Sequence, residues 1–167
     1  MSDLNVSWDQ YHESIERLAV ALRDSKWEFN QIICIARGGM RIGDVLSRIF
    51  KLPLAIISTQ SYVGEAGSER GELTVARHMT MSTASLGDSV LLVDDLVDSG
   101  ITQDVVKRHL FGDFPAIREI RTAVLWYKAC SNYVPDYYVS YLTESPWIHQ
   151  PFEKYDLMKP EDLPVVP

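Results

Sequence analysis

The sequence predicts an α/β protein in which a mostly parallel central sheet is flanked by helices. Two observations indicate this class. Short apolar runs, typical of strands buried on both faces, alternate along the chain with segments of helical periodicity. This alternation favours parallel strands that are joined by right-handed helical crossovers. At 167 residues the chain is of single-domain size, so we expect one domain over residues 1–167.

The first half of the chain predicts two helices and two strands. Ser7, followed three residues later by Gln10, fits a capping box, and a helix with one apolar face follows and ends near Asp24. The next segments are predicted in order as a strand, a helix and a strand: 31–36, 42–50 and 54–58. Residues 64–79 are polar, contain three glycines and show no clear period, which indicates a mobile loop or a hairpin.

The second half continues the same alternation. The predicted order is strand, helix, strand and a fifth strand: 90–93, 102–111, 120–125 and 137–142. The tail from Ser145 is rich in proline and aromatic residues, so we expect it to form a flap over one end of the sheet.

The stretch VLLVDDLVDSGIT at 90–102 carries the clearest chemical signal. Four apolar residues run into Asp94 and Asp95, at the carboxyl end of a strand, where open α/β sheets place ligands. Residues 98–102 predict a turn that leads into a helix starting near Thr102. Such a loop holds phosphate, because the free amides and the helix dipole both favour negative charge. The alternative interpretation is an ordinary strand–turn–helix with an acidic turn.

This stretch resembles the phosphoribosyl-pyrophosphate signature of the type I phosphoribosyltransferases. That signature is a hydrophobic strand, two acids, two or three variable residues, then Asp/Thr-Ser/Thr-Gly-x-Thr, and every position is filled here. The resemblance runs from Trp8 to about Glu153 and is closest to the bacterial xanthine–guanine and hypoxanthine phosphoribosyltransferases. It implies the type I phosphoribosyltransferase fold, with a small C-terminal hood formed by about residues 128–167.

The function that the resemblance implies is purine salvage. Such a glycosyltransferase moves 5-phosphoribosyl from 5-phosphoribosyl 1-pyrophosphate to N9 of hypoxanthine, guanine or xanthine, with Mg²⁺, and releases pyrophosphate. Two alternatives stay open: a regulatory protein of the same fold that senses phosphoribosyl pyrophosphate, and transfer to another base such as uracil. Ile101, where purine enzymes more often have Gly or Lys, and His149, where the hood more often has an acid, leave the preferred purine open.

The resemblance also implies which residues hold the sugar phosphate. Arg37, Gly38 and Gly39 correspond to a pyrophosphate loop, in which glycine permits close approach of the backbone, and the Arg37–Gly38 bond is a candidate cis peptide. The alternative for this loop is a plain strand–helix turn with an exposed arginine. Asp94 and Asp95 are expected to contact the ribose and Mg²⁺, directly or through water. Because adjacent strand residues face opposite sides, we expect only one of them to reach the metal directly. The ribose 5-phosphate set is Asp94, Asp95, Asp98, Ser99, Gly100, Ile101 and Thr102.

The purine side rests on four residues. Asp98 resembles the family's acid beside N7 of the base and is the candidate catalytic residue. Lys128, which follows the strand at 120–125, corresponds to the lysine that donates to the exocyclic O6. Within residues 146–152, which we call the hood segment, Trp147 is expected to stack on the purine and Ile148 to read its edge through the backbone. The alternative for Trp147 is a packing role.

A loop containing Ser61, Tyr62 and Arg70 resembles the flexible loop that closes over the site in this family, where closure excludes water. The alternative is a surface hairpin.

Composition limits the partners. The net charge of −7 argues against a general nucleic-acid binder, and no run of 18 apolar residues predicts a membrane span. The N-terminus lacks the features of a secretory signal. Cys34 and Cys130 match no metal spacing and are expected to be unpaired thiols in a reducing cytoplasm. We therefore expect a cytoplasmic enzyme with small-molecule substrates. The resemblance further implies a homo-oligomer, either a dimer or a tetramer.

Overall fold

A computed structural model describes residues 3–61 and 73–163. The helices are α1 (Trp8–Ser25), α2 (Met40–Phe50) and α3 (Ile101–Asp113). The strands are β1 (Leu4–Asn5), β2 (Gln31–Ala36), β3 (Leu54–Ser61), β4 (Leu73–Val75), β5 (Thr80–Met81), β6 (Ser89–Val93), β7 (Leu96–Val97), β8 (Glu119–Lys128), β9 (Tyr137–Leu142) and β10 (Ile148–His149). Two 3₁₀ turns follow, at Glu153–Asp156 and Pro160–Asp162.

The central sheet is mostly parallel. Its order is β4-β3-β2-β6-β8, with β9 on the far edge of β8 and β7 pairing with β8 beyond the end of β6. Among the strands that the structure describes, only β4 and β5 are antiparallel, and both pair with β3. The antiparallel pairing of β3 with β4 gives the hairpin arrangement that was one of the two expectations for this region. The predicted fold class, an α/β protein with a mostly parallel sheet between helices, is confirmed.

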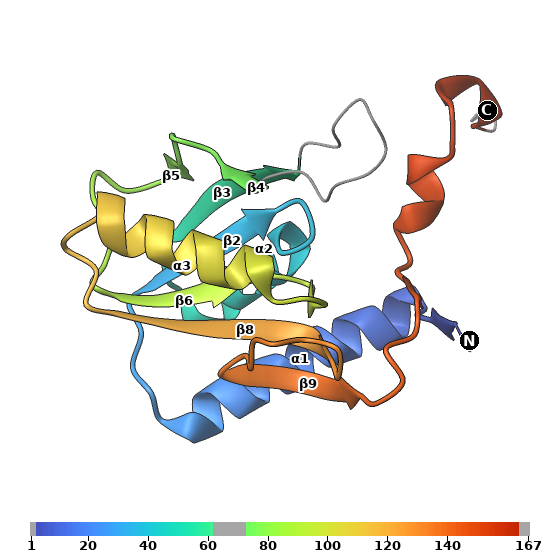
Figure 1. Cartoon of the computed structure of the whole chain (residues 1–167), viewed down its shortest axis with the longest axis horizontal. Coiled ribbons are helices and arrows are strands. Elements are labelled where there is room, and N and C mark those ends of the chain that lie inside the picture. The colour runs from blue at the N-terminus through green and yellow to red at the C-terminus, as the bar shows by residue number, and fades with distance from the viewer. Residues whose placement is uncertain (1–2, 62–72, 164–167) are drawn as a thin grey trace.

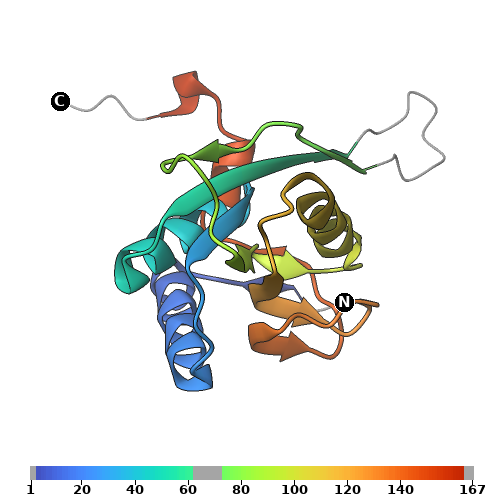
Figure 2. The same cartoon turned by 90° about the vertical axis from the view of Figure 1, so that its left-hand side faces the viewer.

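The helices cover the two faces of the sheet (Figures 1 and 2). Alternate residues of β2 separate the cores: Ile32 and Cys34 pack with α1 and α2, whereas Ile33 and Ile35 pack with α3. The apolar face predicted for α1 is buried, and the Ser7–Gln10 capping box is present. The strands of the parallel sheet therefore sit in a fixed register, with their carboxyl ends at one edge.

Several boundaries differ from the sequence prediction. β8 extends to Lys128 because β7 and β9 pair with its second half, so Lys128 is the last strand residue instead of following the strand. β9 lies inside the range predicted for the hood and extends the central sheet. β1 and β10, which were not predicted, form a separate two-stranded parallel sheet that joins the N-terminal segment to the hood segment. In Figure 1 the chain beyond β10 leaves the body at the side where the parallel strands end.

Candidate active site

The chemistry-bearing segments meet at the carboxyl edge of the parallel sheet. β2 and β6 are paired neighbours, with Cys34 opposite Val93, so the Arg-Gly-Gly segment after β2 lies beside the acids after β6. β8 pairs with β6 on the other side and ends at Lys128. Parallel register therefore brings together residues that are up to about ninety positions apart in the chain.

The loop between β7 and α3 forms a hollow of about 290 Å³. Gly100, the N-cap of α3, has a φ of 85°, and a Cβ at this position would lie 2.2 Å from Cβ of Tyr133, so the turn requires glycine. The first turn of α3 carries amides without intrahelical partners, which suits a phosphate. The hollow is lined by Asp94, Asp95, Leu96, Asp98, Ser99, Gly100, Thr102 and Gln103. Ile101, which was predicted with this set, is exposed and does not line the hollow.

The two adjacent acids are held by different parts of the fold. Asp94 accepts the backbone N–H of Asp95 (3.0 Å) and, from α3, the side-chain amide of Gln103 (3.1 Å). Asp95 accepts the N–H of Leu96 (2.8 Å) and the side-chain amide of Gln150. Burial, and then the negative charge of Asp95, raise the pKa of the Asp94 carboxyl well above its usual value. A nearby cation therefore favours the ionised form of Asp94.

These acids fit the way in which proteins bind Mg²⁺. The described residues contain no group of three or more metal-ligating side chains. Mg²⁺ characteristically uses one or two carboxylates together with substrate phosphates and water, so a pair of acids beside a phosphate hollow is sufficient. Each carboxylate oxygen accepts one hydrogen bond and keeps a further lone pair for a hydroxyl, a water or the metal.

The Arg-Gly-Gly segment turns tightly at the end of β2. The N–H of Gly39 donates to the carbonyl of Ile35 (2.9 Å), so the turn begins within the strand, and the cis peptide bond lies at Ala36–Arg37. The cis bond thus lies one peptide bond before Arg37–Gly38, the candidate that the resemblance raised. A Cβ on Gly38 would lie 2.6 Å from Cγ of Asp95, so this loop approaches the acid closely. The exposed Arg37 side chain contacts Asp156 of the tail at 3.4 Å.

Lys128 and Asp98 face each other at the end of β8. Lys128 is buried, and its Nζ lies 3.6 Å from Oδ1 of Asp98, whose side chain is largely exposed. Sγ of the exposed Cys130 lies 3.2 Å from the same oxygen. A buried cation is thus placed beside the exposed acid of the phosphate loop.

The hood segment presents one exposed ring and one strand edge. Trp147 is 62% exposed, which argues against the alternative of a core-packing role. The carbonyls of Trp147 and His149 accept N–H groups from Leu4 and Val6 of the N-terminal segment (2.8 and 3.0 Å). Backbone groups of Ile148 therefore point to the opposite edge and take no part in the pairing with β1.

Part of the predicted site is not placed. Tyr62 and Arg70 lie outside the described residues, and for Ser61 the structure gives only the backbone, at the end of β3. Sequence reasoning also missed the glutamines, Gln103 and Gln150, that hold the acids. The available signal was their position, since one directly follows Thr102 and the other lies within the hood segment.

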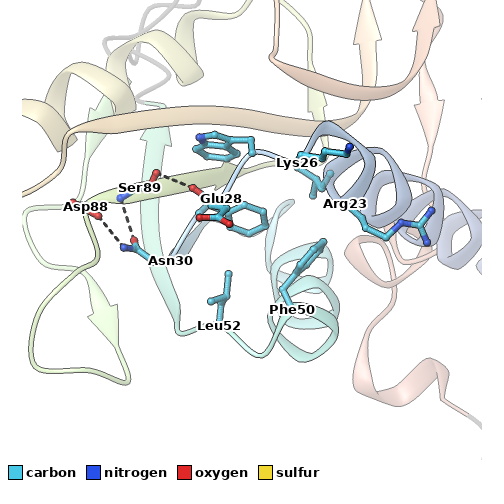
Figure 3. Close-up of a pocket in the computed structure, with 11 residues that line it drawn as sticks. Arg23, Lys26, Glu28, Asn30, Phe50, Leu52, Asp88 and Ser89 are labelled. Atoms are coloured by element: carbon cyan, nitrogen blue, oxygen red, sulfur yellow. Dashed lines mark hydrogen bonds between the residues drawn. The ribbon is translucent and has the colours of Figure 1, made fainter.

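A second hollow, of about 790 Å³, lies at the opposite end of the sheet (Figure 3). Some of its polar groups are paired: the Asn30 amide donates to Asp88 (2.8 Å), and Ser89 Oγ donates to the carbonyl of Glu28 (3.2 Å). The guanidinium of Arg23 points away from the hollow and bonds Asp24. This hollow therefore lies apart from the catalytic edge. Among the described residues, no helix has the length and apolar character needed to cross a membrane.

The fold and site define an α/β protein with an acid pair, and a hollow at the start of a helix, at the carboxyl edge of its sheet. The sequence matches the phosphoribosyl transferase domain family over residues 7–156, and the chain belongs to that family. The resemblance inferred from the sequence is confirmed.

Named relatives make the relationship more specific. The chain is 31% identical over 156 residues to the xanthine-guanine phosphoribosyltransferase of Gluconobacter oxydans (strain 621H), covering 93% of this chain and 87% of that protein. The purine phosphoribosyltransferase of Pyrococcus horikoshii Ot3 superposes with a TM-score of 0.74 at 30% identity, covering 100% of this chain and 99% of that chain. The Helicobacter pylori xanthine-guanine-hypoxanthine phosphoribosyltransferase shares the fold, with a TM-score of 0.76 at 24% identity over 93% of this chain and 96% of that chain.

Proposed function

We propose that this chain is a purine phosphoribosyltransferase of nucleotide salvage. It transfers 5-phosphoribosyl from 5-phosphoribosyl 1-pyrophosphate to N9 of a 6-oxopurine, which is hypoxanthine, guanine or xanthine, and releases pyrophosphate. The observation that carries this proposal is the 3.6 Å contact between Lys128 Nζ and Asp98 Oδ1, which supports a role for the lysine in selecting the base beside the loop that we assign to the phosphate. The names of the 30–31% identical relatives support the purine as acceptor.

The sugar phosphate is held at three points. Amides of the loop from Asp98 to Thr102 bind the 5′-phosphate at the start of α3. Arg37, Gly38 and Gly39 hold the pyrophosphate, and the close backbone approach at Gly38 supports that role. Asp94 and Asp95 orient the ribose hydroxyls. When bound there, Mg²⁺ neutralises charge on the pyrophosphate as it leaves.

The purine is held on the other side of C1. Lys128 donates to O6, the Trp147 ring stacks on the base, and the backbone of Ile148 reads its edge. Asp98 accepts the N7 proton of the base as N9 bonds to C1 and the bond from C1 to the pyrophosphate oxygen breaks. The transition state carries oxocarbenium character, so carboxylates near the ribose stabilise it.

The setting follows from the same proposal. We expect a cytoplasmic homo-oligomer, either a dimer or a tetramer, that acts on small molecules and not on nucleic acid. The two free cysteines and the net charge of −7 support this setting.

The test is product formation by the purified chain with 5-phosphoribosyl 1-pyrophosphate, Mg²⁺ and one base at a time. We expect a nucleoside monophosphate with at least one 6-oxopurine and none with uracil. Failure with every purine, in a folded sample that binds the sugar phosphate, removes the purine assignment. Turnover with uracil alone moves the acceptor to a pyrimidine.

A further inference from the structure

Gln150 is a buried polar residue without a role in the site as described so far. It directly follows β10, three residues after Trp147, and is 5% exposed. Its side-chain Nε2 donates to Oδ2 of Asp95. Its Oε1 is buried and has no hydrogen-bond partner among the described residues. Burying an amide with one unsatisfied end is unfavourable, so packing alone does not explain a glutamine here.

The Asp95 carboxylate is enclosed by three segments. The N–H of Leu96 donates to Oδ1 at 2.8 Å, Gln150 donates to Oδ2, and Gly38 lies close enough that a Cβ there would be 2.6 Å from the carboxylate carbon. The acid loop, the hood segment and the Arg-Gly-Gly loop therefore meet on one carboxylate. Of these three contacts, the one from Gln150 comes from the hood segment, which we assign to the purine.

The neighbouring acid has a different support. Gln103 of α3, 3% exposed, donates to Oδ2 of Asp94 at 3.1 Å and to the carbonyl of Leu96 at 3.3 Å. Each acid thus has its own buried glutamine. Gln103 lies within the phosphate-loop side of the site, whereas Gln150 belongs to the hood segment.

We propose that Gln150 is a positioning residue that couples the purine site to the sugar-phosphate site through Asp95. This inference rests on the proposed function. A purine that fixes the position of the hood segment also fixes the Gln150 amide. That amide then holds the Asp95 carboxylate in the orientation that binds the ribose and Mg²⁺. Thermodynamic linkage makes the effect reciprocal, so a bound sugar phosphate strengthens purine binding by the same factor.

The experiment measures this coupling without turnover. Mg²⁺ and 5-phosphoribosyl 1-pyrophosphate are titrated calorimetrically into the full chain, with and without saturating 9-deazaguanine, whose carbon at position 9 prevents transfer. We expect the purine analogue to tighten sugar-phosphate binding about fivefold or more in the unmodified protein. The coupling ratio is the sugar-phosphate Kd without the purine analogue divided by the Kd with it. Gln150→Met, which keeps the length of the side chain and removes its donor, brings this ratio close to one. Gln103→Met is the matched control: it weakens sugar-phosphate binding but keeps the ratio.

Thermal melting monitored by circular dichroism checks that each variant folds. Gln150→Asn, whose shorter amide does not reach Asp95, replaces Gln150→Met if the latter fails to fold. A ratio near one in the unmodified protein, or an unchanged ratio in whichever Gln150 variant folds, overturns the inference. Failure of the proposed function is a separate result, because it appears as absence of product with every ordinary purine in the turnover assay.

Discussion

Three glycine-to-alanine substitutions test whether close backbone approach builds the site. At Gly38 a new Cβ would lie 2.6 Å from Cγ and Oδ1 of Asp95, which is the end of a side chain. The carboxylate can move aside, but only by losing hydrogen bonds worth about 1.5–3 kcal/mol each. A displacement of about 1 Å at a reacting centre lowers activity on the order of 100-fold. We therefore expect Gly38→Ala to lose about 1–3 kcal/mol of stability and most of its kcat/KM.

The other two substitutions calibrate the first. At Gly39 the Cβ would lie 2.3 Å from the backbone carbonyl oxygen of Val93, which the sheet holds in place, so we expect Gly39→Ala to lose about 3 kcal/mol or more. At Gly112, in α3, no atom lies within 4 Å of a new Cβ, and Gly112→Ala is expected to raise the free energy of unfolding by about 0.5–1 kcal/mol. Urea unfolding followed by circular dichroism gives the stabilities, and initial rates give kcat/KM. Wild-type kcat/KM in Gly38→Ala would refute the reasoning.

Three further predictions concern single side chains. Lys128→Ala is expected to raise the KM for purine about 10- to 100-fold, the value of a hydrogen bond from a charged donor, with the sugar-phosphate KM nearly unchanged; a parallel rise in both makes the lysine structural. A bulky maleimide is expected to modify the exposed Cys130 before Cys34, because the Cys34 thiol is buried and its pKa is raised to about 11. The modification is expected to block transfer, because Sγ of Cys130 lies 3.2 Å from Oδ1 of Asp98. Full labelling by mass spectrometry with retained activity contradicts this, and Cys130→Ser is the protected control. Because the pKa of the Asp94 carboxyl is raised in the folded state, ionisation of Asp94 opposes folding. The loss of stability is absent below pH 3.8, the ordinary pKa of the group, grows as the pH rises above 3.8, and levels off above the folded-state pKa. In chemical denaturation without Mg²⁺, wild type should lose up to about 1.4 kcal/mol per pH unit relative to Asp94→Asn in that window, and parallel curves for the two proteins would show that Asp94 carries no such penalty.

Local pattern predicted the parts of the fold that depend on local chemistry. The strand predicted at 31–36 matches β2 because its residues pack into both cores and a glycine-rich turn ends it. The capping box at Ser7 was recognisable because both partners lie within three residues. β1 and β10 were missed, since each has only two residues and forms only when distant parts of the chain pair.

The same limit applies to the site. The stretch at 90–102 carried the acids and the phosphate loop in one continuous motif. The two acids lie just beyond the end of β6, line the same hollow and are held by different glutamines, and the identity of those glutamines did not follow from the sequence. Gln150 lies 55 residues from Asp95, and only the parallel register and the path of the hood segment bring the two together. Long-range polar contacts of this kind leave no periodic signal.

The pairing of β1 with β10 has a consequence for the order in which the protein matures. β1 and β10 can pair only when residues 4 and 5 and residues 148 and 149 are all present, and Asp3 contacts His149 across 146 positions of sequence. The segment from β6 to α3 needs no such distant partner in sequence, whereas the edge that we assign to the purine does. The edge that we assign to the purine therefore depends on both ends of a contact that spans most of the described chain, and a substitution at Leu4 or Asn5 is expected to disturb it.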